Sequence, residues 1–292
     1  MKLSTTTLGC PSWDLATLIE RTRAMGFDAI DFRGYMGNMK LWEIPEFSSG
    51  LAGTAARIAA SGLAVTCIST GIRCIGRTEA DRAKREHEAK ASAAMCRAFG
   101  APFIRVFGGE FDEVATTRAQ AIEAVGRSLV EVAKIVTDLA DVTVLIETHD
   151  AWTTSEHIQA AVAAASHPAV GICWDIKHTY WVAHETPAYT WARLGPLVHN
   201  THWKDGRRGE EGRRDRLCLL GEGQVPLADA YQVLCAGGYD GPLTLEWEKQ
   251  WHPHIEEPEV AFPHFVSYMR GLASWRRRSL AADAALLSER QL

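Results

Sequence analysis

The sequence predicts a single-domain (β/α)8 barrel, the TIM barrel, on three observations. Short β-branched runs alternate with longer, alanine-rich amphipathic stretches along the whole chain. Eight such pairs fit into 292 residues, and a barrel of this type takes about 250. No linker, low-complexity tract or shift of composition divides the chain. We therefore expect one barrel over residues 1–275 and a C-terminal extension over residues 276–292.

The eight predicted strands are runs of four to six residues rich in Val, Ile, Leu and Thr. They are Leu3–Leu8, Ala29–Phe32, Ala64–Ser69, Phe103–Phe107, Val142–Glu147, Val170–Trp174, Val198–Trp203 and Leu243–Trp247. Helix-like segments follow them near 14–25, 48–61, 79–98, 115–139, 155–165, 186–194, 227–236 and 259–277. The sixth segment is the least regular, because Pro187 and Pro196 bracket it.

Composition and charge narrow the function. Hydrophobic residues make up 47% of the chain, charged residues 23%, and the net charge is −5, which argues against general affinity for nucleic acid or anionic membranes. The N-terminal residues resemble no export signal, and no apolar run approaches the roughly 18 residues of a membrane span. The seven cysteines are scattered without a CxxC pair, which fits a reducing cytoplasm. We expect a cytoplasmic protein that could form homo-oligomers.

Polar residues stand at the C-terminal tips of four consecutive predicted strands. These are Glu147, Asp175, His202 and Glu246, separated by 28, 27 and 44 residues. In a TIM barrel the active face is built at these tips, so the four side chains are expected to converge. Three crowded carboxylates would repel each other, and a divalent cation removes that repulsion. Three carboxylates and one imidazole suit one Mn²⁺, Mg²⁺, Co²⁺ or Zn²⁺.

These residues carry a resemblance to the sugar phosphate isomerase/epimerase superfamily, the xylose isomerase-like TIM barrels. The family pattern is Glu on strand five, Asp-x-x-His on strand six, His on strand seven and Glu on strand eight. It is met here by Glu147, Asp175 with His178, His202 and Glu246. The turn 220–225, Leu-Gly-Glu-Gly-Gln-Val, is similar to the family's Gly-x-Gly turn.

The resemblance implies metal-assisted proton transfer next to a carbonyl group, through an enediolate. It implies Glu147 and Glu246 as the acid–base pair, Mn²⁺ as the preferred metal and a sugar or keto-sugar as the substrate. His178 would bond a substrate hydroxyl group, and Arg208 would hold substrate oxygens.

Other residues near the tips extend the expected site. His149 follows Glu147 where the family more often has Asn between them, and it either acts as an acid or base or supports the site. Lys204 either contacts substrate oxygens or pairs with Asp205. Three tryptophans are expected to line the pocket, because aromatic faces pack on sugar C–H surfaces: Trp13, Trp152 and Trp174.

The sequence leaves three alternatives to a sugar isomerase or epimerase. An endonuclease IV-type nuclease would need more ligand histidines, and the third and fourth strands end in Ser69-Thr70-Gly71 and Phe107-Gly108-Gly109. A lyase that cleaves 3-keto-glycosides would use the same enolisation but expel a leaving group. A non-catalytic sugar-binding barrel would not require the paired carboxylates.

Overall fold

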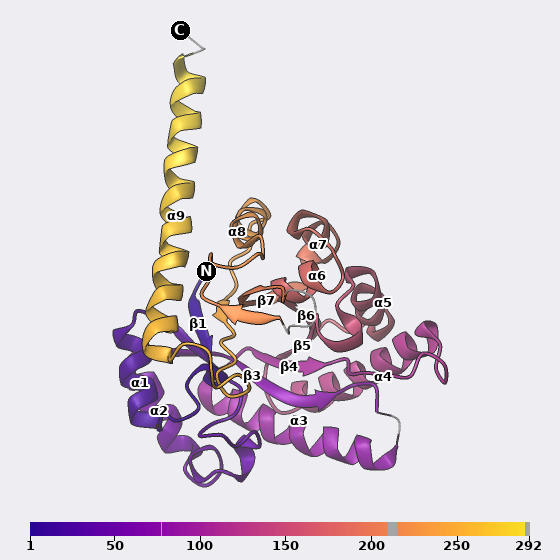
Figure 1. Cartoon of the computed structure of the whole chain (residues 1–292). Helices are drawn as coiled ribbons and strands as arrows, with labels where there is room; N and C mark the ends of the chain where they lie inside the picture. Colours follow the sequence, from indigo (N-terminus) through magenta and orange to yellow (C-terminus); the bar gives the residue numbers. More distant parts are fainter. Residues whose placement is uncertain (77, 210–214, 290–292) are drawn as a thin grey trace.

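Eight parallel strands close into a barrel in the computed structural model, which describes residues 1–76, 78–209 and 215–289 (Figure 1). The strand order around the barrel is β1-β2-β3-β4-β5-β6-β7-β10, with β10 paired to β1. Their bounds are β1 (Leu3–Thr6), β2 (Ala29–Phe32), β3 (Ala64–Arg73), β4 (Phe103–Phe107), β5 (Thr143–Glu147), β6 (Val170–Asp175), β7 (Val198–Trp203) and β10 (Leu243–Leu245). The predicted (β/α)8 fold is confirmed.

Helices cover the outside of the barrel. They are α1 (Leu15–Ala24), α2 (Leu51–Ser61), α3 (Glu79–Phe99), α4 (Arg118–Thr137), α5 (Ser155–Ala165), α6 (Ile176–Trp181), α7 (Pro187–Leu194), α8 (Leu227–Ala236) and α9 (Pro258–Glu289). Several begin at side-chain caps that the sequence supplies. Thr78 and Thr117 form capping boxes with Asp81 and Gln120, at the N-termini of α3 and α4.

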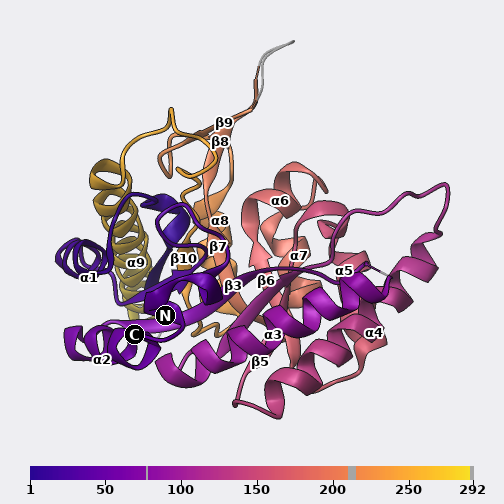
Figure 2. The same ribbon diagram turned by 90° about the horizontal axis from the view of Figure 1, so that it is seen from below.

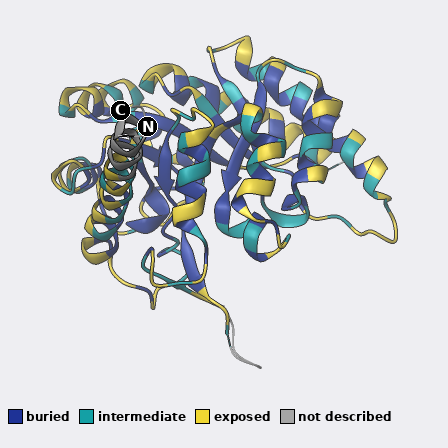
Figure 3. Ribbon diagram, turned by 90° about the horizontal axis from the view of Figure 1, so that it is seen from above, coloured by how far each residue is buried: buried dark blue, intermediate teal, exposed yellow. Residues whose placement is uncertain are grey.

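The strands are buried on both faces, whereas the helices expose their outer faces (Figure 3). Because side chains alternate along a strand, one set points outward beneath the helices and the other into the barrel. Outward residues such as Ile146, Ile172 and Trp174 join the apolar core. The inward set is largely polar and includes Asp31 and Arg105, both buried. The barrel therefore presents charged groups to its own interior.

The structure adds elements that the sequence pattern did not predict. Helix α6 begins directly after β6, with Asp175 as its N-cap. A hairpin of β8 (Asp205–Arg207) and β9 (Arg216–Cys218) follows β7 and extends away from the barrel (Figure 2). The part of the arginine-rich loop at 210–214 lies outside the described residues. Helix α9 continues across the expected boundary between residues 275 and 276.

Two observations bear on the environment of the chain. All seven cysteines are free. Among the described helices, none combines the length and the apolar character that crossing a membrane requires.

Candidate metal centre

Four side chains from consecutive strands meet at the C-terminal end of the barrel. Glu147 ends β5, Asp175 ends β6, His202 lies on β7, and Glu246 directly follows β10. One ligand atom from each lies within 4.8 Å of every other, and all four residues are buried. Glu246 keeps its position beyond the strand because its N–H donates to Trp203 O at 3.0 Å. The structure thus brings together the four residues predicted as metal ligands.

His202 lies between carboxylates on both sides of its ring. Its Nδ1 is 2.8 Å from Glu147 Oε1 and 3.3 Å from Glu246 Oε1, and its Nε2 is 3.5 Å from Asp31 Oδ2. Burial opposes a charged imidazole, but Cys173 and the two glutamates raise the pKa of His202 well above its usual range. Without a metal the ring is therefore an imidazolium cation, protonated on both nitrogens. One of these protons must leave before that nitrogen can bind a metal ion.

Lys204 is a buried cation inside the cluster. Its Nζ lies 2.9 Å from Asp175 Oδ2, 2.6 Å from Glu246 Oε2 and 2.6 Å from Glu248 Oε1. Burial disfavours the ammonium, but Asp175, Glu246 and Glu248 together raise the pKa of Lys204 well above its usual value. Of the two roles expected for Lys204, pairing with Asp205 is not seen; Asp205 instead accepts backbone N–H groups of the 221–225 turn.

Arg105 supplies a second buried cation, from the inner face of β4. Its Nε lies 3.2 Å from Glu147 Oε2, and its Nη1 donates to Thr70 O at 2.9 Å. Burial raises the pKa of Glu147, but Arg105 and His202 together outweigh burial, and the pKa falls to about 2. The pKa of Glu246 is also held well below its usual range, against burial, by Lys204 and His202. Both glutamates are therefore anions that can bind a cation without losing a proton.

The pKa of Asp175 indicates that negative charge in the cluster is only partly compensated. Its Oδ1 accepts the His178 N–H at 2.9 Å and so caps α6. Burial raises its pKa to about 6, and the charges of Glu246 and Glu147 add to this rise against the opposing effect of Lys204. A divalent cation would relieve that repulsion.

The residues present fit a divalent metal. Oε2 of Glu147 and Oδ2 of Asp175 are buried, and neither has a hydrogen bond of suitable geometry to the described residues. Three carboxylate oxygens and one imidazole nitrogen form a donor set that suits hard or borderline divalent ions. Glu147, Asp175, His202 and Glu246 could therefore hold such an ion at the barrel mouth.

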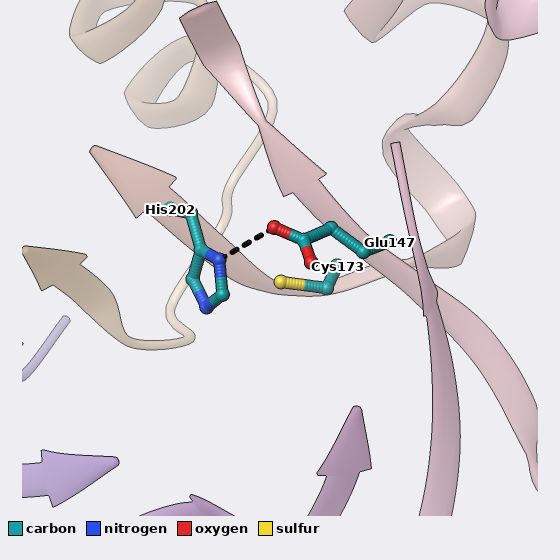
Figure 4. Close-up of side chains that lie close together, drawn as sticks. All are labelled: Glu147, Cys173 and His202. Atoms are coloured by element: carbon teal, nitrogen blue, oxygen red, sulfur yellow. Dashed lines mark hydrogen bonds and ion pairs between the residues drawn. The ribbon is translucent and has the colours of Figure 1, made fainter. Parts of the chain in front are cut away.

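Two functional candidates were missed by sequence reasoning. Cys173 lies two residues before Asp175 on the same face of β6 and comes within 4.8 Å of ligand atoms of Glu147 and His202 (Figure 4). Burial raises the pKa of its thiol to about 12. Asp31, on β2, reaches the other side of the His202 ring. The sequence did hold a signal for Asp31, because it is the one charged residue in the apolar strand Ala-Ile-Asp-Phe.

His149 and His178 lie together at the edge of the cluster. Their ring centroids are 4.7 Å apart with nearly perpendicular planes. His178 Nδ1 is 3.1 Å from Thr148 O and 3.2 Å from Asp175 Oδ2. Burial, reinforced by Lys204, lowers the pKa of His178 well below its usual value, so the ring is neutral. The pKa of His149 is raised. Burial lowers it, but the hydrogen bond to Asp150 Oδ1 at 2.7 Å and the nearby carboxylates outweigh burial.

The remaining predicted site residues lie further away. Arg208 donates to Trp181 O at 2.7 Å beside α6. Trp13 packs edge-on against Phe262 of α9. The other two tryptophans are fully buried, and their indole N–H groups donate to protein acceptors: Trp152 to Gly109 O and Trp174 to Thr179 Oγ1.

Comparison with known proteins gives a family and a set of similar folds. The family model described as xylose isomerase-like TIM barrel matches residues 19–270. A structure of L-ribulose 3-epimerase is similar at a TM-score of 0.76 and 18% identity, over 96% of this chain and 97% of that one. No curated protein sequence matches significantly.

Two further structures have the same fold at comparable identity. The IOLI protein with a binding zinc atom has a TM-score of 0.78 and 17% identity, over 94% of this chain and 98% of that one. The 3-keto-D-glucoside 4-epimerase YcjR from E. coli has a TM-score of 0.73 and 17% identity, over 93% and 99%. At such identities the likeness establishes the fold and leaves the reaction open.

Proposed function

The chain belongs to the xylose isomerase-like TIM barrel family, and from that premise we propose that it is a divalent-metal-dependent enzyme that isomerises or epimerises a sugar. One observation carries the proposal. Glu147, Asp175, His202 and Glu246 place ligand atoms within 4.8 Å of one another at the end of the barrel where enzymes of this fold bind substrates. Buried carboxylates cost free energy unless charge compensates them, so such a cluster is evidence of a function.

The proposed chemistry is proton transfer at a carbon next to a carbonyl group. A bound divalent ion would supply Lewis acidity that makes this carbon acidic. Glu147 and Glu246 would remove and return the proton, since both are anions and both contact His202 Nδ1 from different strands. Return on the opposite face gives an epimer, whereas return to the neighbouring carbon gives an isomer. General acid–base steps of this kind contribute about 10²–10⁴-fold each.

The neighbouring side chains would position the substrate. Lys204 would hold Glu246 and Asp175 in place through its two short ion pairs. His178 is neutral and is held by Thr148 O, so it would hydrogen-bond a substrate hydroxyl group. The side chain of His149 is 35% exposed, so it would contact the substrate at the solvent-facing side of the site. Arg208, Trp13 and Trp152 would contribute only at the periphery, whereas Trp174 bonds Thr179 and would not line the site.

We propose an isomerase or epimerase ahead of the lyase alternative. Two of the similar structures are named as epimerases of sugars or keto-sugars. Another is named with a zinc atom. We propose Mn²⁺ as the working metal, and Zn²⁺ is the second ion to test. The sugar-binding barrel without catalysis is less favoured, because it does not explain four buried carboxylates and the partly exposed Glu248 around Lys204 and His202.

The test is solvent exchange. The protein is incubated with Mn²⁺ in D₂O and offered ketoses, keto acids and 3-keto-glycosides. The proposal expects deuterium at one carbon next to the carbonyl of one compound, and no deuterium with Glu246→Gln. Cleavage of a glycoside without exchange into recovered substrate would instead favour the lyase. Absence of both would leave a sugar-binding barrel.

A further inference from the structure

A cavity of about 910 Å³ lies at the tops of β2 and β3, beside the N-terminal half of α3. Such a volume is that of a small-molecule site and exceeds what a single sugar ring fills. Apolar side chains and a tryptophan form part of its wall: Met39, Trp42, Ile72 and Ile75. The cavity therefore has room for a ring-sized group with apolar faces.

Arg33 lines the cavity and follows Asp31, which reaches the candidate metal centre, by two residues. Asp31 points into the barrel, where it approaches His202. Arg33 is the first residue after β2 and so lies nearer the mouth of the barrel than Asp31. Arg33 lines the cavity, and its guanidinium lies 5.9 Å from the Phe107 ring, which Arg105 also covers at 3.9 Å. Arg33 therefore joins the cavity to the strand that carries Asp31.

The cavity has an excess of positive charge. Its lining holds five cationic side chains and three carboxylates: Arg33, Lys40, Arg73, Lys84 and Arg85 against Glu43, Asp81 and Glu88. Lys40 pairs with Glu43, and Arg85 pairs with Glu131. Among residues 1–76, 78–209 and 215–289, no carboxylate oxygen comes within 4.0 Å of the charged groups of Arg33, Arg73 or Lys84.

Among the described residues, Glu88 forms no ion pair within 4.0 Å with the cations of the cavity. Its Oε1 accepts the Gly71 N–H, and burial raises the pKa of its carboxyl group, against the opposing charges of Arg33 and Arg105. Arg33 in turn is partly desolvated beside the like charge of Arg105, and its pKa falls to about 10. It remains a cation at neutral pH. A desolvated guanidinium without a close partner favours an incoming oxyanion.

We propose that this cavity binds a ring-sized substituent of the substrate that carries an anionic group, held by Arg33 and Arg73. Arg73 is the strand partner of Phe107 in the β3–β4 pairing, so it lies beside the ring that Arg33 covers. The carboxylates of β5, β6 and β10 would then face the reacting end of the substrate and the arginines of β2 and β3 its acidic end. This inference rests on the proposed function, since it names the part of the substrate that lies away from the metal.

The probes are benzoate and its neutral isostere benzamide, which differ in charge and little in shape, together with inorganic phosphate. Their affinities are measured by titration of the Mn²⁺-loaded protein. Because a hydrogen bond to a charged group changes affinity by roughly tenfold or more, we expect benzoate to bind at least about tenfold more tightly than benzamide. Arg33→Gln and Arg73→Gln should each remove most of this preference.

Arg127→Gln is the matched control, because Arg127 is exposed on α4 and pairs with Glu123 of the same helix. It should keep the preference. Equal affinities for benzoate and benzamide, or a preference that survives in the Arg33→Gln/Arg73→Gln double variant, would overturn the proposal. Phosphate that binds more tightly than benzoate with the same dependence on the arginines would overturn the ring-sized substituent.

The same samples are titrated with Mn²⁺ to separate the two proposals. Arginine-dependent benzoate binding in a protein that takes no Mn²⁺ would contradict the metal-dependent function alone. Normal Mn²⁺ binding and deuterium exchange, without preference for benzoate, would contradict the proposed anion-binding cavity alone.

Discussion

The ammonium group of Lys204 lies 2.6 Å from Oε2 of Glu246, so a fully buried lysine bonds directly to a residue proposed as both metal ligand and acid–base group. Lys204 also bonds Asp175 and Glu248. The lysine therefore supplies the charge that keeps three carboxylates together when no metal is bound. Its neighbour on the inner face, His202, holds the other side of the cluster.

Lys204→Met should destabilise the metal-free protein by about 3–5 kcal/mol, because it leaves buried carboxylates uncompensated. The change is measured by urea denaturation, and added Mn²⁺ should restore part of the loss. Lys134→Met is the control, since Lys134 is exposed on α4, and it should change stability by no more than about 0.5 kcal/mol. Equal effects of the two substitutions would show that Lys204 does not balance the cluster.

Glu147→Gln and Glu246→Gln should each slow proton exchange by about 10²–10⁴-fold, because an amide can neither remove nor return the proton. Glu248→Gln tests the specificity of this effect. Glu248 contacts Lys204 but is outside the predicted ligand set, so its loss should be smaller. Exchange is followed as deuterium content of recovered substrate. Full exchange in Glu246→Gln would remove that residue from the proposed pair.

Stabilisation by Mn²⁺ should be greater at pH 7.5 than at pH 5.5. The pKa of Asp175 is raised to about 6 in the metal-free fold. Its protonation therefore favours folding at low pH, and this contribution is lost as pH rises through about 6. The metal offsets the repulsion that then appears. Release of the His202 proton acts in the same direction, because protons compete with the metal for the ring.

Thermal melts with and without Mn²⁺ at the two pH values measure this difference. Asp175→Asn should reduce it, because the amide does not titrate. A metal-induced shift in melting temperature that is the same at both pH values would mean that Asp175 is not compensated by the ion.

Asp150→Asn should lower the pKa of His149. Burial already lowers this pKa, and the hydrogen bond to Asp150 heads the contributions that raise it above 6.5. Histidine proton resonances followed against pH give the midpoint directly. If His149 transfers protons, the pH profile of exchange should move with that midpoint. An unchanged midpoint would show that Asp150 does not set the charge of His149.

The barrel could be predicted because its strands and helices repeat with clear periods. The second strand, 29–32, and the seventh, 198–203, begin and end where expected. Helix α6 could not be predicted, because six residues carry too little periodicity and the helix depends on the Asp175 cap. The β8–β9 hairpin was hidden within a charged segment that reads as a solvated loop.

The metal-ligand cluster could be predicted because strand tips in this fold share one place in space. The place of Cys173 beside this cluster could not be predicted, because a cysteine within an apolar strand usually serves only to pack the core. Trp174 illustrates what strand alternation adds. It lies next to Asp175 on β6 and therefore faces the helices rather than the barrel interior, as its bond to Thr179 confirms. The positively charged cavity is formed by loops and α3, which are far apart in sequence, so no local pattern predicts it.

The most direct test of the central claim relates metal occupancy to proton exchange. Chelator-treated protein is reconstituted with increasing Mn²⁺, and bound metal per chain is measured together with the rate of deuterium incorporation into the active compound. The account predicts that exchange rises with occupancy, saturates at one ion per chain, and is lost with the ion in His202→Ala. Exchange at full rate in the metal-free protein, or one bound ion per chain in His202→Ala with unchanged affinity, would contradict it.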